Sequence, residues 1–449
     1  MSDTIVALAT PYGRSGIGVI RLSGRNSVEI VRKFVRDENF SLKPRIATLK
    51  KFYELETSDV IDEAVITYFQ SPQSFTGEDV VEISCHGSPV ILRQILDLCL
   101  KLDARMAEAG EYSLRALSNG RINLTQAEAI RDLIEAQSVA AAKQSIRQLQ
   151  GEFSKQLQPL KDDLLEVIVI LESSLEFVED DLPDYQIETV KQKLFKIINR
   201  LDLMASTFQS GKLLREGLRV ALVGRPNVGK SSLFNALLGH ERAIVTEIAG
   251  TTRDQLHEKF VIKDIPISLI DTAGLRETSD LVESIGVERS KAVMFDSDLI
   301  VILLDGSEKI TAEDKEIISQ VKGLNYLIAI NKKDLKQINN EIFETSKTVH
   351  ISAKTGEGLT ELQETIIEPF MPQEYESSSF LVSDARHNDL LLRAKFEIES
   401  SCHLIDEKKS EEIILVGLHN ALNFLGKITG ETSTEDMLSQ IFSTFCIGK

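Results

Sequence analysis

The sequence predicts a chain of mixed α/β and α class, with an N-terminal α/β domain, a helical bundle and a second α/β domain inserted into that bundle. Three observations support this prediction. The 449 residues exceed what one ordinary hydrophobic core contains. Residues 119–214 and 376–449 carry apolar side chains at helical spacing. The segment between them, 215–375, alternates apolar strands with helices.

The N-terminal domain, residues 1–118, combines short β-rich runs with turn signals. The expected strands are TIVALAT, GIGVIRLSG, EAVITYF and DVVEISC, and SPVILRQILDLCLKL is expected to form a helix. This mixture is typical of an α/β domain.

The helical segment 119–214 is expected to be interrupted only at Pro159 and Pro183. Because the two ends of a domain often lie close together, one domain is readily inserted into a loop of another. We therefore expect 119–214 and 376–449 to pack as one helical domain around the inserted domain 215–375. Two separate helical domains are the alternative.

The composition indicates a soluble cytoplasmic protein that has no contact with membranes. No run approaches the roughly 20 apolar residues of a membrane span, and the N-terminus lacks a basic signal segment. The four cysteines form no CxxC pair, which favours a reducing compartment. The formal charge of −18 argues against a basic coat, so an RNA partner would need a local basic patch or another subunit.

The run GRPNVGKS, 224–231, lies between the expected strand LRVALV and the expected helix SLFNALLG. A G-x-x-x-x-G-K-S loop in this position turns backbone N–H groups toward phosphates. Lys230 is expected to reach the β- and γ-phosphate oxygens, and Ser231 is expected to bind Mg²⁺. The loop therefore predicts a nucleoside triphosphate site.

Two later runs predict the switch loops around the γ-phosphate. In AGTTRD, 249–254, Thr252 is expected to offer its hydroxyl to the metal, with Thr251 beside it. In the following DTAG run, Asp271 is expected to hold Mg²⁺ through its water shell, and the Gly274 amide to face the γ-phosphate.

The runs NKKD, 331–334, and SAK, 352–354, predict the base. The Asp334 carboxylate only accepts hydrogen bonds and matches two adjacent donors on guanine that adenine lacks. Asn331 is expected at the other edge of the base. The nucleotide contacts that these motifs predict are Gly224, Asn227, Val228, Gly229, Lys230, Ser231, Ser232, Ala249, Gly250, Thr251, Thr252, Asp271, Thr272, Ala273, Gly274, Asn331, Lys332, Asp334, Ser352, Ala353 and Lys354.

Leu275 follows the DTAG run, where Ras-like GTPases commonly carry a glutamine that orients the attacking water. Two other residues are candidates for this work. The side-chain carbonyl of Asn227, in the phosphate loop, is suited to hold a monovalent cation, and Glu283 is suited to orient water. From the residues alone, Asn227 as a turn residue after Pro226 and Glu283 as a solvated carboxylate remain equally open.

With these motifs, the chain resembles the MnmE (TrmE) family of tRNA-modification GTPases over almost its whole length. The runs that carry the resemblance are TPYGRSGIGVIRLSG, SFTGEDVVEISCHGSP, AGEYSLRALSNGRINLTQAEAI, LLREGLRVALVGRPNVGKSSLFNALLG, IVTEIAGTTRD, DTAGLRE and FCIGK. The resemblance implies an N-terminal tetrahydrofolate-binding domain that dimerises, a helical-bundle domain and an inserted Ras-like P-loop G domain.

The resemblance also implies potassium-stimulated GTP hydrolysis by two G domains that dimerise across their nucleotides. Lys230, Thr252 and Glu283 would be catalytic, with Glu283 as a remote general base or water organiser. Mg²⁺ would bind Ser231 and Thr252. The residues around K⁺ would be Asn227, Thr246, Ile248 and Thr251. By the same resemblance, Thr246, Glu247 and Ile248 would also contact the nucleotide.

A tetrahydrofolate derivative, 5-formyl- or 5,10-methylene-tetrahydrofolate, would by the same resemblance bind Arg21, Glu82, Arg121 and Lys449. Arg121 departs from the family pattern, which commonly has lysine there, and the planar arginine fork is not equivalent to a point charge. A surface ion pair is the alternative for Arg21 and Glu82.

Members of the family act as homodimers with the FAD-binding protein MnmG (GidA), in a heterotetramer or larger complex. They add an aminomethyl or carboxymethylaminomethyl group at C5 of the wobble uridine of tRNA. Tetrahydrofolate would supply the carbon, FAD and NADH would belong to the partner, and GTP hydrolysis (an acid anhydride hydrolase reaction) would supply a conformational cycle. Two other functions remain open: a ribosome-assembly GTPase similar to Era or EngA, and a regulatory switch that does not hydrolyse GTP.

Neither of two cysteines with polar neighbours is expected to be a nucleophile. A strand around Cys85 would put the adjacent His86 on the opposite face. No general base is identifiable near Cys446, for which a conformational role is the alternative.

Overall fold

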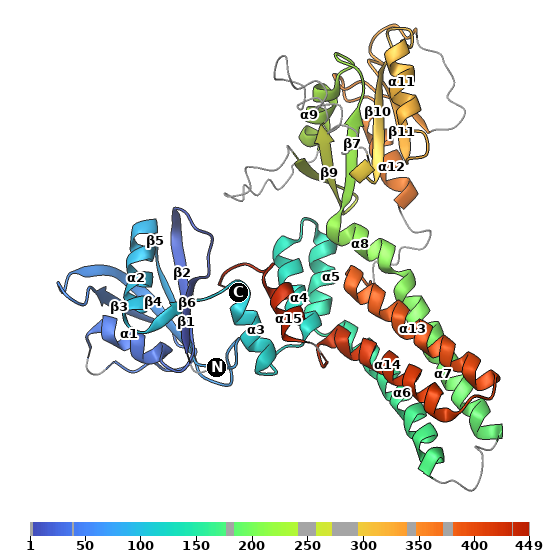
Figure 1. Ribbon diagram of the computed structural model, residues 1–449. Helices are drawn as coiled ribbons and strands as arrows, with labels where there is room; N and C mark the ends of the chain where they lie inside the picture. Colours follow the sequence, from blue (N-terminus) through green and yellow to red (C-terminus); the bar gives the residue numbers. More distant parts are fainter. Residues whose placement is uncertain are drawn as a thin grey trace, which may run out of the picture. The chain divides into compact units, whose positions relative to one another are not determined.

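The computed structural model describes residues 3–37, 40–176, 184–240, 257–271, 295–338, 347–370, 380–432 and 434–448 (Figure 1). The chain divides into two compact units. Unit 1 comprises 1–131, 148–162 and 422–449, and unit 2 comprises 132–147 and 163–421.

A six-stranded sheet forms the centre of unit 1. Its strands are β1 (Thr4–Leu8), β2 (Ser15–Ser23), β3 (Thr48–Tyr53), β4 (Val60–Phe69), β5 (Val80–Gly87) and β6 (Ala104–Met106). They lie in the order β3-β4-β5-β2-β1-β6, and every neighbouring pair is antiparallel except β1 and β6. The four predicted strands are β1, β2, β4 and β5, whereas the sequence pattern does not reveal β3 or β6.

Helices cover both faces of this sheet. The predicted helix α2 (Pro89–Lys101) and the unpredicted α1 (Ser27–Val35) pack on the face that contains Val6. Ile5 and Ala7 point to the opposite face and pack against Tyr112 of α3 (Glu111–Ser118). This alternation is the period of two of a strand that is buried on both faces.

The C-terminal segment packs in unit 1. Phe442 at the end of α15 (Glu435–Phe442), together with Phe445, contacts Leu124 and Ala127 of α4 (Leu124–Glu135). Residue Ile447 then forms an isolated bridge with Ala109, just before α3. The last residues of the chain therefore lie beside the N-terminal sheet and its third helix.

The second unit contains another six-stranded sheet. Its strands are β7 (Leu218–Val223), β8 (His257–Ile262), β9 (Ile265–Asp271), β10 (Leu299–Asp305), β11 (Tyr326–Asn331) and β12 (Thr348–His350). The order is β12-β11-β10-β7-β9-β8, and all pairs are parallel except β8 with β9. Five of these strands match the predicted ones, and β8 is the exception.

Helices again cover both faces of the second sheet. Val220 shares a core with α9 (Lys230–His240) and α12 (Leu359–Ile367), and a short 3₁₀ helix, η2 (Glu368–Phe370), follows α12. The next residue, Ala221, points to the other face, where the core includes side chains of α11 (Ala312–Gln320). Both cores consist almost wholly of aliphatic side chains, as expected of buried parallel strands.

The remaining helices are α5 (Val139–Leu149), α6 (Glu152–Glu176), α7 (Asp184–Ser206), α8 (Phe208–Glu216), α13 (Ala385–Asp406) and α14 (Glu411–Thr429). The antiparallel helices α7 and α13 pack together and are joined by ion pairs from Lys191 to Asp406 and from Lys395 to Asp202. Helices from before and after the inserted domain thus pack together. The expected interruption at Pro159 is wrong, because α6 continues through this residue.

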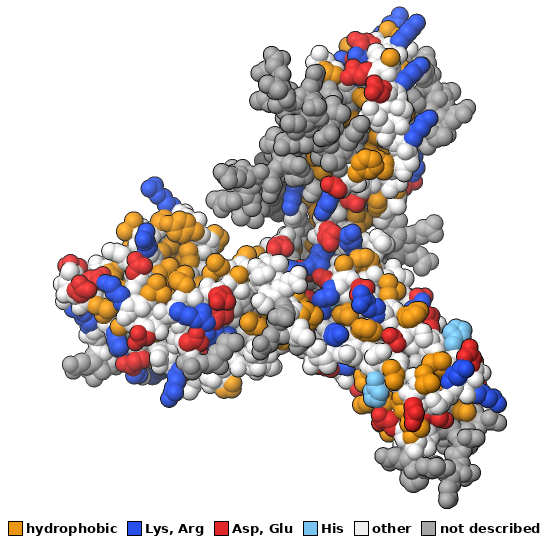
Figure 2. All heavy atoms as spheres, viewed as in Figure 1, with side chains coloured by type: hydrophobic (Ala, Val, Ile, Leu, Met, Phe, Trp, Pro, Cys, Tyr) orange, Lys and Arg blue, Asp and Glu red, His pale blue; other side chains and the backbone are white. Residues whose placement is uncertain are grey.

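The α/β and α fold class is confirmed, and the four domain ranges stay a prediction. No helix in the described parts of the chain combines the length and the apolar character needed to cross a bilayer. On the face shown in Figure 2, basic and acidic side chains of the described residues are interspersed.

Candidate functional site

The carboxyl ends of β7, β10 and β11 meet at one edge of the unit 2 sheet. The parallel register pairs Ile302 with Val223 and Asp305 with Asn331, so the loops that follow these strands are neighbours. Open α/β sheets bind their ligands at this edge. The predicted phosphate loop and base-recognition loops all follow strands that end here.

The phosphate loop follows β7 and ends where α9 begins, at Lys230. Asn227 (φ 65°) and Gly229 (φ 100°) have left-handed backbone conformations. A side chain at Gly224 would overlap the backbone of β10, so the loop needs glycine there. Nζ of Lys230 donates hydrogen bonds to the carbonyl oxygens of Gly224 (2.7 Å) and Arg225 (2.9 Å). The loop therefore encloses the ammonium group that the motif assigns to phosphate oxygens.

The first turn of α9 offers a second feature for phosphate binding. The first N–H groups of a helix have no partner within the helix, and the partial positive charge there favours anions. Ser231 and Ser232 lie in this turn with exposed side chains. The hydroxyl of Ser231 at this end of the helix is a ligand that Mg²⁺ accepts when phosphates are bound there. The described residues therefore fit a nucleotide with its metal.

Asn331 connects three loops of the site. Its buried side chain donates from Nδ2 to the carbonyl oxygen of Val228 (2.8 Å) and accepts at Oδ1 from the N–H of Ala353 (2.9 Å). It therefore joins the phosphate loop to the loop after β12. Its predicted contact with the base itself stays a prediction.

Asp334 has the properties that guanine recognition requires. Its Oδ1 accepts a hydrogen bond of 2.6 Å from the hydroxyl of Ser352. This hydrogen bond holds the pKa of Asp334 below its ordinary value, so the carboxyl is ionised and only accepts at neutral pH. The predicted pair NKKD and SAK is thus brought together at the edge of the sheet.

An additional ion pair supports the base loop. Nζ of Lys332 lies 2.5 Å from Oδ2 of Asp305, and the other oxygen of Asp305 accepts from the backbone and hydroxyl of Ser307. Burial raises the pKa of Asp305, but the bonds from Lys332 and Ser307 outweigh it, so the pKa lies below its ordinary value. Sequence reasoning missed Asp305; its place at the end of a buried strand was the available signal.

A second group of predicted residues lies in unit 1. Arg21 of β2 and Glu82 of β5 are cross-strand partners, and their side chains form an ion pair of 2.8 Å. Arg21 also donates to the carbonyl oxygen of Gly448 (3.1 Å), and its guanidinium lies 5.7 Å from the ring centre of Tyr112. The predicted folate residues Arg21 and Glu82 therefore contact each other, and Arg21 contacts the C-terminal segment.

Arg121 approaches the loop before β5. The position that a Cβ on Gly77 would occupy lies 3.2 Å from Cγ of Arg121. Asn119, two residues earlier, donates from Nδ2 to the carbonyl oxygen of Thr76 (2.7 Å). The side chain of Arg121 is exposed, and Lys449, the fourth predicted folate residue, lies outside the described residues.

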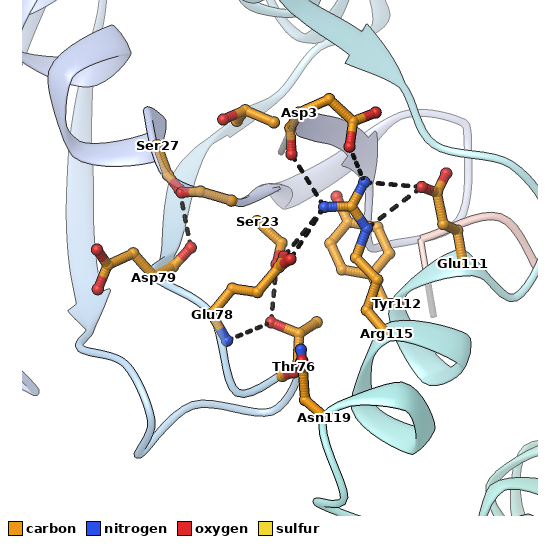
Figure 3. A network of polar contacts seen from close by, with 12 residues as sticks. Asp3, Ser23, Ser27, Thr76, Glu78, Asp79, Glu111, Tyr112, Arg115 and Asn119 are labelled. Atoms are coloured by element: carbon orange, nitrogen blue, oxygen red, sulfur yellow. Dashed lines mark hydrogen bonds and ion pairs between the residues drawn. The ribbon is translucent and has the colours of Figure 1, made fainter. Parts of the chain in front are cut away.

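A buried arginine, Arg115, joins three segments of unit 1 (Figure 3). Its guanidinium contacts the carboxylates of Asp3 (2.9 Å), Glu78 (3.1 Å) and Glu111 (2.9 Å). Asp3 precedes β1, Glu78 precedes β5 and Glu111 begins α3. Arg105 adds a second positive charge, because it pairs with both Asp3 and Glu111. Sequence reasoning missed this cluster, since its members share no local motif.

Comparison with known proteins identifies the family. A family profile for the GTP-binding protein TrmE N-terminus matches residues 4–121, and a profile for the MnmE helical domain matches residues 124–446. Across the whole of both chains, 46% of the residues are identical to the tRNA modification GTPase MnmE of Aquifex aeolicus (strain VF5). The chain belongs to the MnmE family. The resemblance in its motifs is thereby confirmed.

A second MnmE relative, from Alkaliphilus metalliredigens (strain QYMF), is 42% identical, and the alignment again covers both chains completely. Among solved structures, the G domain of the T. maritima FeoB iron transporter is 31% identical. It matches 34% of this chain and 97% of that chain, with a TM-score of 0.26.

Several residues that the MnmE resemblance assigns to the GTP site lie outside the described residues. Asp271 ends β9, and its side chain also lies outside them. Leu275 belongs to the same group. The predicted site residues concerned are Thr246, Glu247, Ile248, Ala249, Gly250, Thr251, Thr252, Thr272, Ala273, Gly274 and Glu283.

The two cysteines near polar groups differ in burial in this MnmE-family chain. Cys85 is buried in β5, and burial raises its pKa to about 11, whereas the adjacent His86 is exposed and pairs with Asp62. The strand thus separates the two side chains as predicted. Cys446 is exposed, and its role stays a prediction.

Proposed function

We propose that this MnmE-family chain hydrolyses GTP to drive a conformational cycle in the modification of the tRNA wobble uridine. The observation that carries the proposal is that two groups lie at the same edge of one sheet. One is the ionised carboxylate of Asp334, which only accepts hydrogen bonds, and the other is the enclosed ammonium of Lys230. One group suits the guanine edge and the other suits the phosphates.

The chain's own residues perform binding and positioning. On GTP binding, Lys230 exchanges the carbonyl oxygens of Gly224 and Arg225 for phosphate oxygens. Ser231 and Thr252 would hold the metal, which when bound would neutralise charge on the β- and γ-phosphates. Glu283, directly or through a second water, orients the water that attacks the γ-phosphate, because Leu275 has no polar atom for this task.

A potassium ion beside the phosphates is the proposed substitute for an arginine finger. Bound K⁺ would offset the charge that develops between the β- and γ-phosphates. Asn227 supports this assignment, since its side chain is exposed on a left-handed turn of the phosphate loop. Thr246, Ile248 and Thr251 are the other proposed contacts, and the ion would be enclosed when two G domains meet.

The test compares steady-state GTP turnover in K⁺ and in Na⁺. We expect faster turnover in K⁺, and Asn227→Ala should keep GTP binding while losing most of the potassium stimulation. An unchanged potassium response in Asn227→Ala would remove this residue from the ion site. Equal, negligible turnover in both salts would instead favour a switch that does not hydrolyse GTP.

We also propose that unit 1 binds a tetrahydrofolate derivative at Arg21, Glu82, Arg121 and Lys449. The partly exposed pair of Arg21 and Glu82, next to the C-terminal backbone, supports this site. The buried ring of Tyr112 lies against Arg21 from the core side, and the charged pair suits a polar heterocycle with an acidic tail.

Calorimetric titration of the full chain with 5-formyl-tetrahydrofolate tests the folate site. Arg21→Met should weaken binding about tenfold or more, because it removes charge-assisted hydrogen bonds. The control is Arg93→Met, which removes an exposed arginine of α2 that pairs with Asp97. Equal affinities in the two variants would leave Arg21 with Glu82 as an ordinary ion pair.

We propose in addition that the chain acts together with partner proteins. The chain would form homodimers and act with the FAD-binding MnmG to add an aminomethyl or carboxymethylaminomethyl group at uridine C5. The net charge of −18 and the interspersed charges in Figure 2 favour a partner that carries much of the tRNA contact. Mass analysis of wobble nucleosides tests this after incubation of tRNA with both proteins, GTP, NADH, 5,10-methylene-tetrahydrofolate and either ammonium or glycine, which supplies the nitrogen. Loss of the modified nucleoside when the chain is omitted is the expected result.

A further inference from the structure

Arg225 is the second residue of the phosphate loop, and its side chain contacts the segment after β10. Its Nη2 donates a hydrogen bond of 2.5 Å to Oε2 of Glu308, and its Nε lies 3.4 Å from Oδ1 of Asp314. Glu308 lies between β10 and α11, and Asp314 lies in the first turn of α11. We call these three residues the Arg225 cluster.

Asp314 is a fixed anchor within this cluster. It is buried, and its Oδ2 accepts from the backbone N–H (2.9 Å) and the hydroxyl (2.8 Å) of Thr311. The Thr311 hydroxyl accepts in return from the N–H of Asp314, which completes a capping box at the start of α11. Reciprocal bonds of this kind leave the carboxylate little freedom to move.

The remaining atoms of Arg225 and Asp314 complement each other. Asp314 Oδ1 and Arg225 Nε are both buried and have no hydrogen-bond partner in the described parts of the chain. They face each other at 3.4 Å, so a shift of a few tenths of an ångström completes the bond. Loss of the arginine would leave a buried carboxylate oxygen with no counter-charge, which is costly.

The backbone of Arg225 belongs to the phosphate site, although its side chain does not. Its carbonyl oxygen accepts from Nζ of Lys230, and Asn227 with its left-handed backbone follows two residues later. When Lys230 turns to a phosphate, the loop loses two hydrogen bonds that hold its shape. The side-chain attachment of Arg225 to Glu308 and Asp314 does not depend on Lys230.

We propose that Arg225 is a positioning residue for GTP binding: attached to Glu308 and Asp314, it keeps the phosphate loop open while Lys230 binds the phosphates. This inference rests on the proposed function in taking GTP as the ligand. It assigns a role in the same site to Glu308 and Asp314, which are not among the predicted nucleotide contacts.

The test is Arg225→Met, which keeps the length of the side chain and removes its charge. The KM for GTP and the Kd for GDP should both rise about ten- to hundredfold, as expected when bonds between charged groups are lost. The kcat at saturating GTP should fall much less. A variant that merely misfolds in part has fewer active molecules, which lowers kcat and leaves KM unchanged.

A double-mutant cycle with Glu308→Gln locates the effect. In wild type, Glu308→Gln should raise KM, whereas in Arg225→Met it should add little, because the pair is already broken. Lys263→Met is the matched control, since it breaks an ion pair of 2.9 Å with Glu364 in the same unit. That variant should leave KM and Kd unchanged.

The proposal is overturned if Arg225→Met retains the wild-type KM and Kd, or if it lowers only kcat. Additive effects of Arg225→Met and Glu308→Gln would also overturn it. Failure of the proposed function is distinguishable, because wild type itself would then show neither GDP binding nor GTP turnover.

Discussion

The phosphate loop of unit 2 and the charge cluster around Arg115 in unit 1 are both networks of polar groups, yet they are assembled from different distances along the chain. Lys230 bonds to carbonyl groups five and six residues before it. Arg115, in contrast, pairs with a carboxylate at Glu78, 37 residues away, and with Asp3, 112 residues away. One network lies largely within loops, and the other joins separate elements.

This difference separates two uses of charge. The nucleotide loops leave polar groups available to a ligand: Asp334 keeps acceptor capacity, and Ser231 is exposed. The carboxylates around Arg115 are directed at arginines inside the fold, so they hold β1, the loop before β5 and α3 together. A polar network with unused hydrogen-bond donors or acceptors indicates a binding site. A network whose donors and acceptors all bond to one another indicates a structural role.

The largest expected effect separates ligand recognition from stability. Asp334→Asn should shift the preference from guanine toward xanthine nucleotides by about a thousandfold or more, because the amide can donate where the carboxylate only accepts. Competition binding with GDP and xanthosine diphosphate measures this shift, and thermal unfolding should change little. Retained guanine specificity would show that Asp334 is not the base-recognition residue.

Arg115→Met is expected to have the opposite profile. Removing this buried arginine takes its charge from the buried Glu111 and from the more exposed Asp3 and Glu78, of which only Asp3 and Glu111 keep Arg105 as a partner. The loss should destabilise unit 1 by about 3–5 kcal/mol. Hydrogen exchange in β1, β5 and α3 should accelerate, while GDP binding stays at its wild-type value. Arg105→Met, at a more exposed position of the same cluster, should cost about 1 kcal/mol or less. Similar exchange in the two variants would contradict a central role for Arg115.

Helix α8 offers an intermediate case, since its contact is long-range but involves no charge. A methyl group on Gly211 would overlap the carbonyl oxygen of Val382, so Gly211→Ala should cost about 1–3 kcal/mol of stability in unit 2. Gly239→Ala in α9 is the control, because no atom of the described residues lies within 4 Å of its added methyl group. Unfolding in urea should separate the two; equal midpoints would show that the backbone around Val382 yields easily.

The smallest expected effect is the pH dependence of unit 1. Burial raises the pKa of Asp3 and of Glu111, but the bonds from Arg105 and the nearby charge of Arg115 outweigh burial, so both pKa values are lowered in the fold. Their contribution to stability is therefore complete above the unfolded pKa values of about 4 and is lost as pH falls through the folded ones.

Hydrogen exchange of β1 and α3 between pH 6 and pH 3 checks this dependence. The rates must first be corrected for the intrinsic pH dependence of exchange. Protection should fall toward pH 3, and the fall should be smaller in Arg115→Met, in which one of the causes of the lowered pKa values is gone. A fall of the same size in both proteins would place the acid-sensitive groups elsewhere.

Prediction from sequence succeeded where the determinants are local. The strands β7, β10 and β11 of unit 2 consist mainly of aliphatic residues, and the phosphate loop follows β7 directly. It failed for β3, whose pattern on the exposed edge of the unit 1 sheet contains few buried residues, and at Pro159, which α6 accommodates. Tertiary packing overrides a local helix breaker when the rest of the helix is held by its neighbours.

The sequence by itself determined that this chain carries a phosphate loop, a guanine-type base loop and the motifs of the MnmE family. Each of these is recognised from residues that are adjacent in the chain, because a single short loop carries the groups that would contact the ligand. Only the tertiary structure decided that Arg115 lies among three carboxylates and that Arg225 points at Glu308 and Asp314. The i,i+4 spacing of Glu111 and Arg115 is visible in the sequence, but it does not show that the pair is buried. The other contacts join segments that are distant in the chain and become neighbours only when the fold is packed, so no spacing in the sequence reveals them.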